Sequence, residues 1–456
     1  MLLNIIFILS IILFSIKLEN KFKVPMPISL ITLSLTIGLI FQDFIGFTTK
    51  EFFAEEMIIL IVILILSDTF MLKLKDIKEN YFSLIILAGL FVVLSVLLGV
   101  LSKNFIFSDI DISVGALIAL FAMITATDPV SVISVFNQYK LPHKLKFLAE
   151  GESLFNDAIA LIMFSAFGLY LLSGNELTVS YVSLVTLETI AGSVFIGFIT
   201  GFIGLSLMKT TKDIRVEFIL ILLIAYSSFY IAEHITIIGN NHLSGILSEI
   251  VAILTLMTFI NKSFEKENAL IESDINSIIH NESNGNKVKQ YFQKKLLNNL
   301  IINITDTERT KDIYSFINVL ALLANGILFI SLAQIINFNN LILYWKEILL
   351  VFLMSTLIRF ILLFVFQKVA NFSRKIPEFN FKWTLILTFS GIKGGLSIVM
   401  LNMLFLAIPD FQHKILFESI ITGVILLSTY LYVLGLIITI SFNKKQFLKE
   451  CEFEKH

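Results

Sequence analysis

Long apolar runs separated by short polar segments are the dominant pattern along the chain. Many runs are long enough to cross the roughly 30 Å apolar core of a bilayer as a helix. The pattern predicts about thirteen spans, at 2–17, 24–41, 56–72, 81–101, 112–136, 150–173, 180–208, 217–232, 243–260, 314–337, 345–367, 382–407 and 414–442. We therefore expect an all-α polytopic membrane protein, with helices in 1–260 and 314–442, a polar loop at 261–313 and a short tail at 443–456.

Composition agrees with this expectation and excludes several classes of protein. Apolar residues make up 57% of the 456 positions, far above a water-soluble domain. The net charge of −1 gives no electrostatic basis for a nucleic-acid partner, and the single Cys451 cannot build a disulfide framework or a cysteine metal site. The sequence contains no Gly-rich phosphate-binding loop, so nothing in it indicates a nucleotide-driven pump. We expect neither an enzyme nor a cofactor.

The basic residues predict the orientation in the membrane. Assigned to alternate sides of the predicted spans, most of the 34 Lys and Arg residues fall on one side, including all those in 261–313 and in the tail. The opposite loops hold only Lys50, Lys103, Lys346 and Lys414. Because basic loops stay in the cytoplasm, we expect the N-terminus outside and the C-terminus inside. The loop 261–313 is interpreted as a variable cytoplasmic linker or, around 287–301, as a basic amphipathic helix on the membrane surface.

Ionisable residues inside the predicted spans are the candidate functional residues, because each is costly at bilayer depth. They are Asp68, Asp128, Glu150, Glu152, Asp157, Glu233, Glu249, Arg359 and Lys393. A partner, a cavity or a function is needed to retain them.

One predicted span, 112–136, contains a charge and a proline near its centre, in "FAMITATDPVSVISVF". Pro129 has no N–H and its ring clashes with the preceding turn, so the helix should break and free carbonyls near Thr125 and Thr127. Such carbonyls are tolerated in a membrane only where they line a cavity or bind something. Together with Asp128 and the threonine hydroxyls they favour a hard cation. The simpler alternative is a kink with Asp128 neutralised by a base.

The next span, 150–173, carries "ESLFND", in which polar residues repeat at four-residue spacing. Ser153 and Asp157 share one helix face, and Glu152 and Asn156 share the neighbouring face. Asn156 could donate to the carbonyls freed by the break, while Asp157 offers a titratable carboxylate. These residues, with the broken span, predict one site.

The span 382–407 is the second interrupted helix, because "GIKGGLS" places three glycines around Lys393. Each interrupted helix is the middle one of three consecutive predicted spans, the fourth to sixth and the eleventh to thirteenth. This arrangement indicates an inverted-repeat transporter with its site where the two helices cross. Lys393 would balance the carboxylates there, and Glu152 is its expected ion-pair partner. The alternative is that the glycines only permit close helix packing.

At these residues the sequence resembles the bacterial sodium/proton antiporters of the NhaP type, relatives of the animal sodium/proton exchangers. The similar segments are "ATDPV", "EGESLFNDAIALIMF", "HLSGIL", "LIRF" and "GIKGGLS". The resemblance implies a core domain and a dimerisation domain in a homodimer of the cell membrane, working by an elevator-like movement. It also implies that Asp157, Asp128, Ser153 and Thr127 surround the sodium ion and that Glu152 pairs with the base of the twelfth span.

The function that follows is exchange of a monovalent cation, sodium in the first place, for protons. Asp157 would bind one or the other, and a single titrating carboxylate beside the uncharged Asn156 predicts electroneutral exchange. Asp68, Glu233 and Arg359 are possible accessory residues. The alternatives are a potassium/proton antiporter, a cation channel, or a receptor or scaffold that kept the fold without transport.

Overall fold

The computed structural model describes residues 2–40, 50–211, 213–238, 241–258, 311–333, 335–372 and 379–453. Within these ranges the regular structure is helical, apart from an isolated bridge between Thr236 and His242. Eight described segments are long and apolar enough to cross a membrane: Leu74–Leu101, Val114–Phe136, His143–Leu172, Val179–Met208, Ile214–His234, Lys311–Ala333, Trp345–Asn371 and Lys414–Glu452. Shorter apolar helices are Met26–Ile37, Ile58–Phe70, Gly245–Thr258 and Gly395–Ala407. The all-α class is confirmed, whereas the count of thirteen spans stays a prediction.

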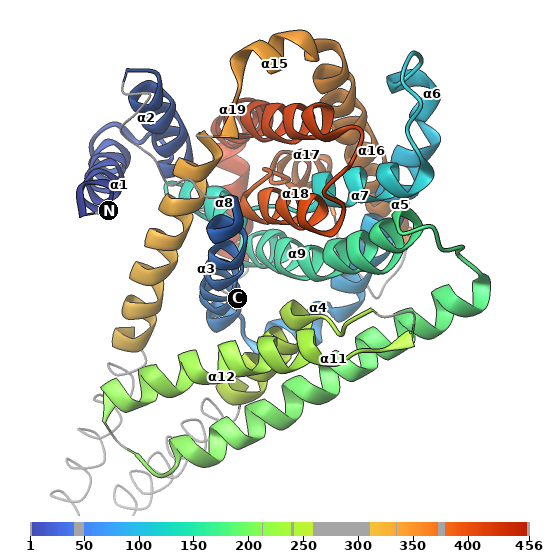
Figure 1. Cartoon of the computed structure of the whole chain (residues 1–456). Helices are drawn as coiled ribbons and strands as arrows, with labels where there is room; N and C mark the ends of the chain where they lie inside the picture. The colour runs from blue at the N-terminus through green and yellow to red at the C-terminus, as the bar shows by residue number, and fades with distance from the viewer. Residues whose placement is uncertain are drawn as a thin grey trace, which may run out of the picture.

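The first helices, α1 (Leu2–Phe22) and α2 (Met26–Ile40), pack on each other at one side of the molecule (Figure 1). Pro25 and Pro27 bracket the start of α2, where a helix has N–H groups without intrahelical partners and a proline is tolerated. The next helix, α3 (Lys50–Met71), contacts both the central bundle and the outer helix α12 (Ile214–His234). It therefore stands at the border between two groups of helices.

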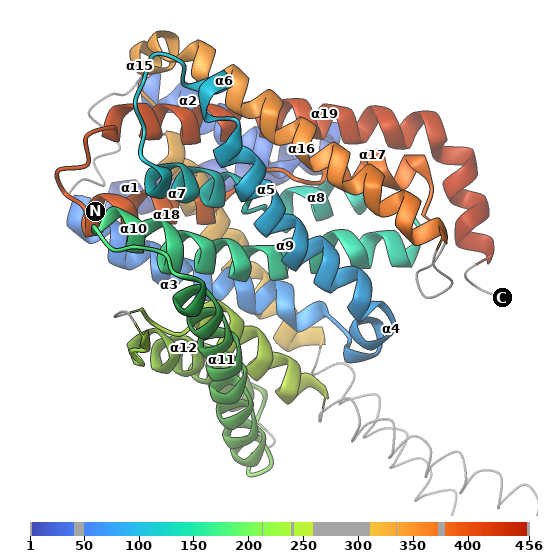
Figure 2. The same cartoon turned by 90° about the vertical axis from the view of Figure 1, so that its right-hand side faces the viewer.

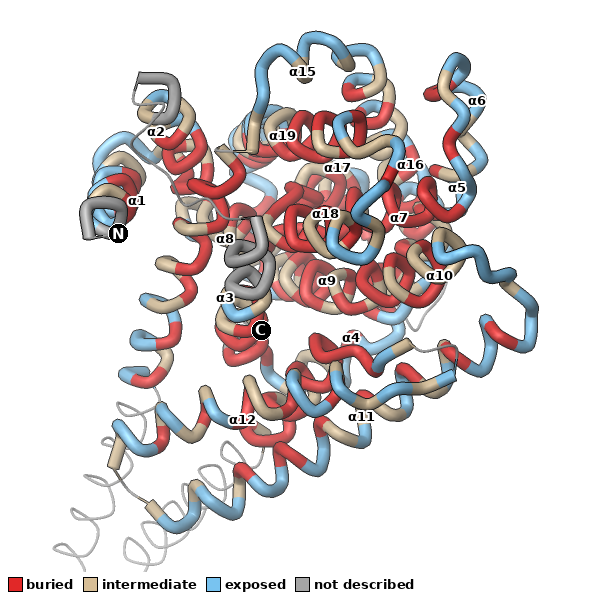
Figure 3. Tube along the Cα trace, in the orientation of Figure 1, coloured by how far each residue is buried: buried red, intermediate tan, exposed pale blue. Residues whose placement is uncertain are grey.

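The outer group contains two long helices that lie side by side beneath the bundle, α11 (Val179–Met208) and α12 (Figure 2). Small residues four apart on α11, at Ser193, Gly197 and Gly201, form its buried stripe. A Cβ added at Gly197 would lie 2.4 Å from the carbonyl oxygen of Ser248, so glycine lets helix Gly245–Thr258 approach. The opposite face of α11 is exposed along its length (Figure 3).

Two segments of the bundle contain a π-helical turn. The first runs through α4 (Leu74–Leu84), η1 (Ile85–Leu90) and α5 (Phe91–Leu101), followed by the short α6 (Lys103–Ile106). The second runs through α9 (His143–Ile162), η2 (Met163–Leu169) and α10 (Tyr170–Leu172). A π-helical turn interrupts the regular i to i−4 backbone hydrogen bonds of an α-helix. In η2 the carbonyl of Ala166 accepts a hydrogen bond from the Tyr181 hydroxyl at 3.0 Å.

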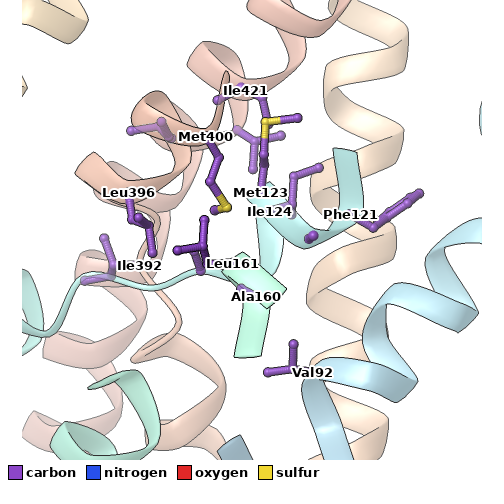
Figure 4. Close-up of a cluster of buried hydrophobic side chains, with 14 of the residues drawn as sticks. Val92, Phe121, Met123, Ile124, Ala160, Leu161, Ile392, Leu396, Met400 and Ile421 are labelled. Atoms are coloured by element: carbon purple, nitrogen blue, oxygen red, sulfur yellow. The ribbon is translucent and has the colours of Figure 1, made fainter. Parts of the chain in front are cut away.

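The two predicted interruptions are both present. One separates α7 (Val114–Thr125) from α8 (Pro129–Phe136), and the other separates α17 (Phe381–Phe389) from α18 (Gly395–Ala407). Buried apolar side chains surround them, with Met123 from α7, Ile392 from the second link and Met400 from α18 close together (Figure 4). This shell separates the interruptions from lipid.

The bundle is completed by α15 (Phe338–Leu343), α16 (Trp345–Phe372) and α19 (Lys414–Phe453). Helix α19 is 40 residues long and continues well past the expected end of the last span, so most of the predicted tail is helical. Its Glu450 accepts from the Trp383 indole at 3.0 Å, which ties this extension to the start of α17. The predicted loop 261–313 lies almost entirely outside the described residues.

Candidate functional site

The two broken spans touch at their extended links. The backbone N–H of Asp128 donates to the carbonyl of Ile392 at 2.7 Å, and the Ser397 hydroxyl donates to the carbonyl of Met123 at 2.7 Å. A Cβ added at Gly394 would lie 2.4 Å from the Cβ of Asp128, so only glycine fits there without a shift. The crossing that the inverted-repeat pattern predicted is therefore a direct backbone contact.

Asp128 holds the start of α8. One carboxylate oxygen accepts from the N–H of Val130 at 3.2 Å, and the other accepts from the N–H of Ser131 at 3.3 Å and from the Ser131 hydroxyl. Pro129 occupies the first helical position, where its missing N–H leaves no donor without a partner. The negative charge thus faces the positive end of α8, as a helix N-cap does.

Helix α9 supplies the partners for the rest of the first link. The N–H of Thr127 donates to Asp157 Oδ1 at 3.1 Å, and the Ser153 hydroxyl donates to the Thr127 carbonyl at 3.0 Å. The hydroxyls of Thr127 and Ser153 are 2.8 Å apart, and Asn156 donates its amide to the carbonyl of Thr125 at 2.8 Å. The predicted contact between Asn156 and the freed carbonyls is confirmed, because the four-residue spacing points both polar faces toward the break.

The partner of Glu152 is Arg359, and the prediction of Lys393 is wrong. Arg359 donates through both terminal nitrogens to the two Glu152 oxygens, at 2.9 and 2.7 Å, and through Nε to the carbonyl of Leu387 at 3.0 Å. A planar guanidinium can bind a carboxylate in this forked manner, whereas an ammonium group cannot. A Cβ at Gly391 would lie 2.7 Å from Arg359 Nε, so that glycine makes room for the guanidinium. The sequence analysis named Arg359 only as a possible accessory residue.

Lys393 occupies a different place in the site. Its side chain is buried and its backbone N–H donates to the Ser428 hydroxyl at 3.1 Å. Among the described residues it forms no ion pair. It lines a small cavity together with Glu152, Asn156 and Arg359. Lys393 therefore lies beside the site without an ion-pair partner in the described part of the chain.

Two cavities are lined by residues of α9 that precede and follow Asp157 in the sequence. One, of about 200 Å³, is lined by Glu150 of α9 together with Asp68 and Pro129. The other, of about 380 Å³, is lined by Leu161 of α9 together with Glu233 and further polar groups of the outer helices. Asp157 lies between Glu150 and Leu161 on the same helix and is partly exposed. Each cavity thus contains at least one carboxylate and approaches the same stretch of α9.

Two of the three accessory candidates, Asp68 and Glu233, line these cavities, whereas Arg359 lines the small cavity beside Lys393. Asp68 lines the first. Glu233 lies in the second, where it accepts from the N–H of Gly245 at 2.8 Å. The sequence analysis missed Asn325, which lines the Asp68 cavity and whose buried amide nitrogen has no partner in the described part of the chain. An asparagine within "LALLANGILF" was the available signal.

Comparisons with known proteins agree with this architecture. The family model described as sodium/hydrogen exchanger, transmembrane, matches residues 6–258. The Na(+)/H(+) antiporter NhaG of Bacillus atrophaeus is 26% identical over 84% of this chain and 64% of its own length. The antiporter NhaH of Halobacillus aidingensis is 27% identical over 55% of this chain and 62% of its own length.

The solved structure of the sodium proton antiporter MjNhaP1 from Methanocaldococcus jannaschii has the same fold, with a TM-score of 0.69, 18% identity and 99% of each chain covered. The chain spans somewhat less than two thirds of the length of the curated relatives named above. The family model covers more than half of the sequence and includes both α9 and the first broken span. On this evidence the chain belongs to the sodium/hydrogen exchanger family.

Proposed function

We propose that the protein is a secondary transporter that exchanges a monovalent cation, sodium in the first place, for protons. The observation that carries the proposal is the position of Asp157. This carboxylate is partly exposed and accepts a hydrogen bond from the broken backbone at Thr127. It lies on α9 between Glu150 and Leu161, each of which lines a cavity. The names of the relatives, Na(+)/H(+) antiporters, support the same reaction.

Coupling arises because one carboxylate accepts either ligand. A proton and a sodium ion each neutralise Asp157, and each excludes the other. The loaded site then has the same net charge in both cases, so either form passes the apolar barrier at lower cost than the empty, charged form. Exchange is therefore one for one and electroneutral.

The cation ligands we propose are Asp157, Ser153, Thr127 and Asp128. They offer only oxygen atoms, which suits a hard monovalent cation. The hydroxyls of Ser153 and Thr127 already lie 2.8 Å apart, and the backbone N–H of Thr127 donates to Asp157. Asp128 contributes its charge from the cap of α8, while Asn156 holds the link in shape.

Alternating access would follow from a movement of the bundle relative to the outer helices. The arrangement of the helices supports this movement, because α3 contacts both the bundle and α12. Residues of the same helix, α9, also line both cavities. We further propose a homodimer in the cell membrane, with the N-terminus outside. The excess of Lys and Arg in alternate loops supports that orientation.

Purified protein in liposomes with an imposed pH gradient tests the function. Addition of sodium should dissipate the gradient in wild type and should not in Asp157→Asn. A series of sodium, lithium and potassium separates the sodium/proton exchanger from the potassium/proton alternative. Unchanged exchange by Asp157→Asn would contradict the assignment of the site, and potassium activity without sodium activity would contradict the cation.

A further inference from the structure

The cavity of about 380 Å³ is lined from both sides of the boundary between the bundle and the outer helices. The bundle contributes Leu161 of α9 and Ala166 of η2, and the outer group contributes Thr189 of α11. Leu161 follows Asp157 by four residues and therefore lies on the same face of α9. The contacts that hold the two sides of this cavity together are thus next to the face that carries the titratable carboxylate.

A hydrogen bond crosses this boundary beside the cavity. The Tyr181 hydroxyl of α11 donates to the carbonyl of Ala166 in η2 at 3.0 Å, and both residues are buried. The ring of Tyr181 also stacks on Tyr170 of α10, with the ring centroids 4.0 Å apart and the planes 13° from parallel. The π-helical turn of the bundle is therefore held from outside its own helix by a single side chain of the outer group.

Asn241, which lines the same cavity, orients the Tyr181 hydroxyl. Its side-chain amide donates to the hydroxyl oxygen, so the proton of the hydroxyl is left to donate to Ala166. Asn241 is itself fixed, because its backbone carbonyl accepts from the N–H of Ile237 at 2.7 Å. The outer group thus presents an oriented donor to the bundle.

Along the chain, the bundle and α11 are joined by the short turn 173–178, between the end of α10 and the start of α11. Gly174 in this turn has a φ of +85°, and a Cβ built there would meet no atom within 4 Å. The turn is therefore free of packing at that point and suits a hinge, where a few loop residues absorb a change of backbone angles. The hydrogen bond from Tyr181 lies just beyond this hinge and restrains it.

We propose that the hydrogen bond from Tyr181 to Ala166 is a latch, which holds the bundle against the outer helices at this cavity and opens when the bundle moves. The inference rests on the proposed function, because a latch has a role only if the bundle moves. In the latched state Thr189 is 2% exposed. The net contribution of one hydrogen bond corresponds to about a fivefold change in an equilibrium constant, so loss of the hydroxyl should shift the population toward the open form by that factor.

The test uses Tyr181→Phe, which keeps the stacking ring and removes the hydroxyl. The reporter is Thr189→Cys in a Cys451→Ser background, since Cys451 is the single cysteine of the chain. The Thr189 hydroxyl has no hydrogen-bond partner in the described part of the chain, so its replacement by a thiol breaks no contact there. The rate of labelling by a small charged methanethiosulfonate reagent is measured in lipid nanodiscs, where both faces of the protein are accessible.

The matched control is Tyr226→Phe. The Tyr226 hydroxyl also donates to a backbone carbonyl, that of Ile59 at 2.9 Å, but it joins α12 to α3 and leaves the boundary at the cavity untouched. We expect Tyr181→Phe to raise the labelling rate at position 189 about fivefold and Tyr226→Phe to leave it unchanged.

A second reporter distinguishes a latch from local loosening. Asn325→Cys places a thiol in the cavity of about 200 Å³, next to Asp68. In alternating access one cavity opens as the other closes, so Tyr181→Phe should lower the labelling rate at position 325 while it raises the rate at position 189. Loosening of the Tyr181 contact alone would change only the reporter at position 189.

Equal labelling at position 189 with and without the Tyr181 hydroxyl would overturn the proposal, and so would a rise at position 189 without a fall at position 325. If Tyr181→Phe does not yield folded protein, Asn241→Ala, which removes the donor to the same hydroxyl, should change both rates in the same directions, and unchanged rates would count against the latch. The proposed function is judged separately. Absence of sodium/proton exchange by the wild type in liposomes would contradict it, whereas both labelling rates are read without transport.

Discussion

The carboxylate of Asp157 accepts a hydrogen bond from the backbone N–H of Thr127 at 3.1 Å, so the titratable group of one helix is bound to the broken backbone of another. Loss of this carboxylate removes both a charge and a contact of the link. We expect Asp157→Ala and Asp157→Asn each to abolish exchange in liposomes while the protein stays folded, because neither leaves a group that takes up a proton or a cation. Ser419→Ala, which removes a hydroxyl bonded only within its own helix, is the control and should retain exchange.

Asp128 has two roles that can be tested separately: it caps the N-terminus of α8, and it carries a negative charge beside the site. Asparagine caps a helix about as well as aspartate, whereas alanine does not, so Asp128→Ala should lower the stability by about 1 kcal/mol and Asp128→Asn should not. Both should lose most of the exchange, because both remove a negative charge beside the site. Thermal melting and liposome exchange, measured on the same preparations, give the two answers. Wild-type exchange by Asp128→Asn would show that only the cap counts.

The ion pair between Arg359 and Glu152 should contribute more to the stability of the fold than Lys393 does. Arg359→Ala leaves the buried Glu152 without its forked partner, a loss of roughly 3–5 kcal/mol for breaking a buried pair. Lys393→Ala should cost less, since Lys393 forms no ion pair among the described residues. Melting temperatures of the two variants make the comparison. The double variant Arg359→Ala with Glu152→Ala should recover part of the loss, and a lower melting temperature for Lys393→Ala than for Arg359→Ala would contradict the pairing.

Gly394 is required by the crossing. Alanine there would place its Cβ 2.4 Å from the Cβ of Asp128, which forces the two links apart. We expect Gly394→Ala to reduce exchange strongly and to lower the melting temperature. Gly89→Ala is the matched control, because a Cβ at that position meets no atom within 4 Å. Equal behaviour of the two variants would mean that the links tolerate separation.

Electroneutral exchange predicts a rate that does not depend on membrane potential. Liposomes with fixed pH and sodium gradients are measured with and without a potassium–valinomycin clamp. The rate should be the same in both conditions, because one proton and one sodium ion carry equal charge. A rate that follows the imposed potential would require a second carrier group, for which Asp68 and Asp128 are the candidates.

Much of the site follows from sequence because its signals are local. A proline after an aspartate in an apolar run predicts the break in the first crossing helix, and the glycines around Lys393 predict the second. The four-residue spacing of Ser153 and Asp157 places both on the face that meets the break. Each inference needed only the geometry of one helix.

The ion pair between Glu152 and Arg359 could not be predicted from such local sequence patterns. Glu152 and Arg359 are 207 positions apart, and their contact depends on how α16 packs against α17 and the bundle. By charge alone, Lys393 and Arg359 could each pair with Glu152. Only the forked hydrogen bonding seen in the structure distinguishes the two. Asn325 was overlooked for a related reason, since a single amide in an apolar run indicates a polar contact without saying with which helix.

The hydrogen bond from Asp128 to Ile392 has a mechanical consequence. Were the two links to part, an amide and a carbonyl would be left bare in a region where no water can replace the lost partner. The buried apolar side chains around the crossing therefore act as a lock, and the four half-helices α7, α8, α17 and α18 have to move as one block. Sliding is left to the surfaces around that block, where α3 meets α9 and α18.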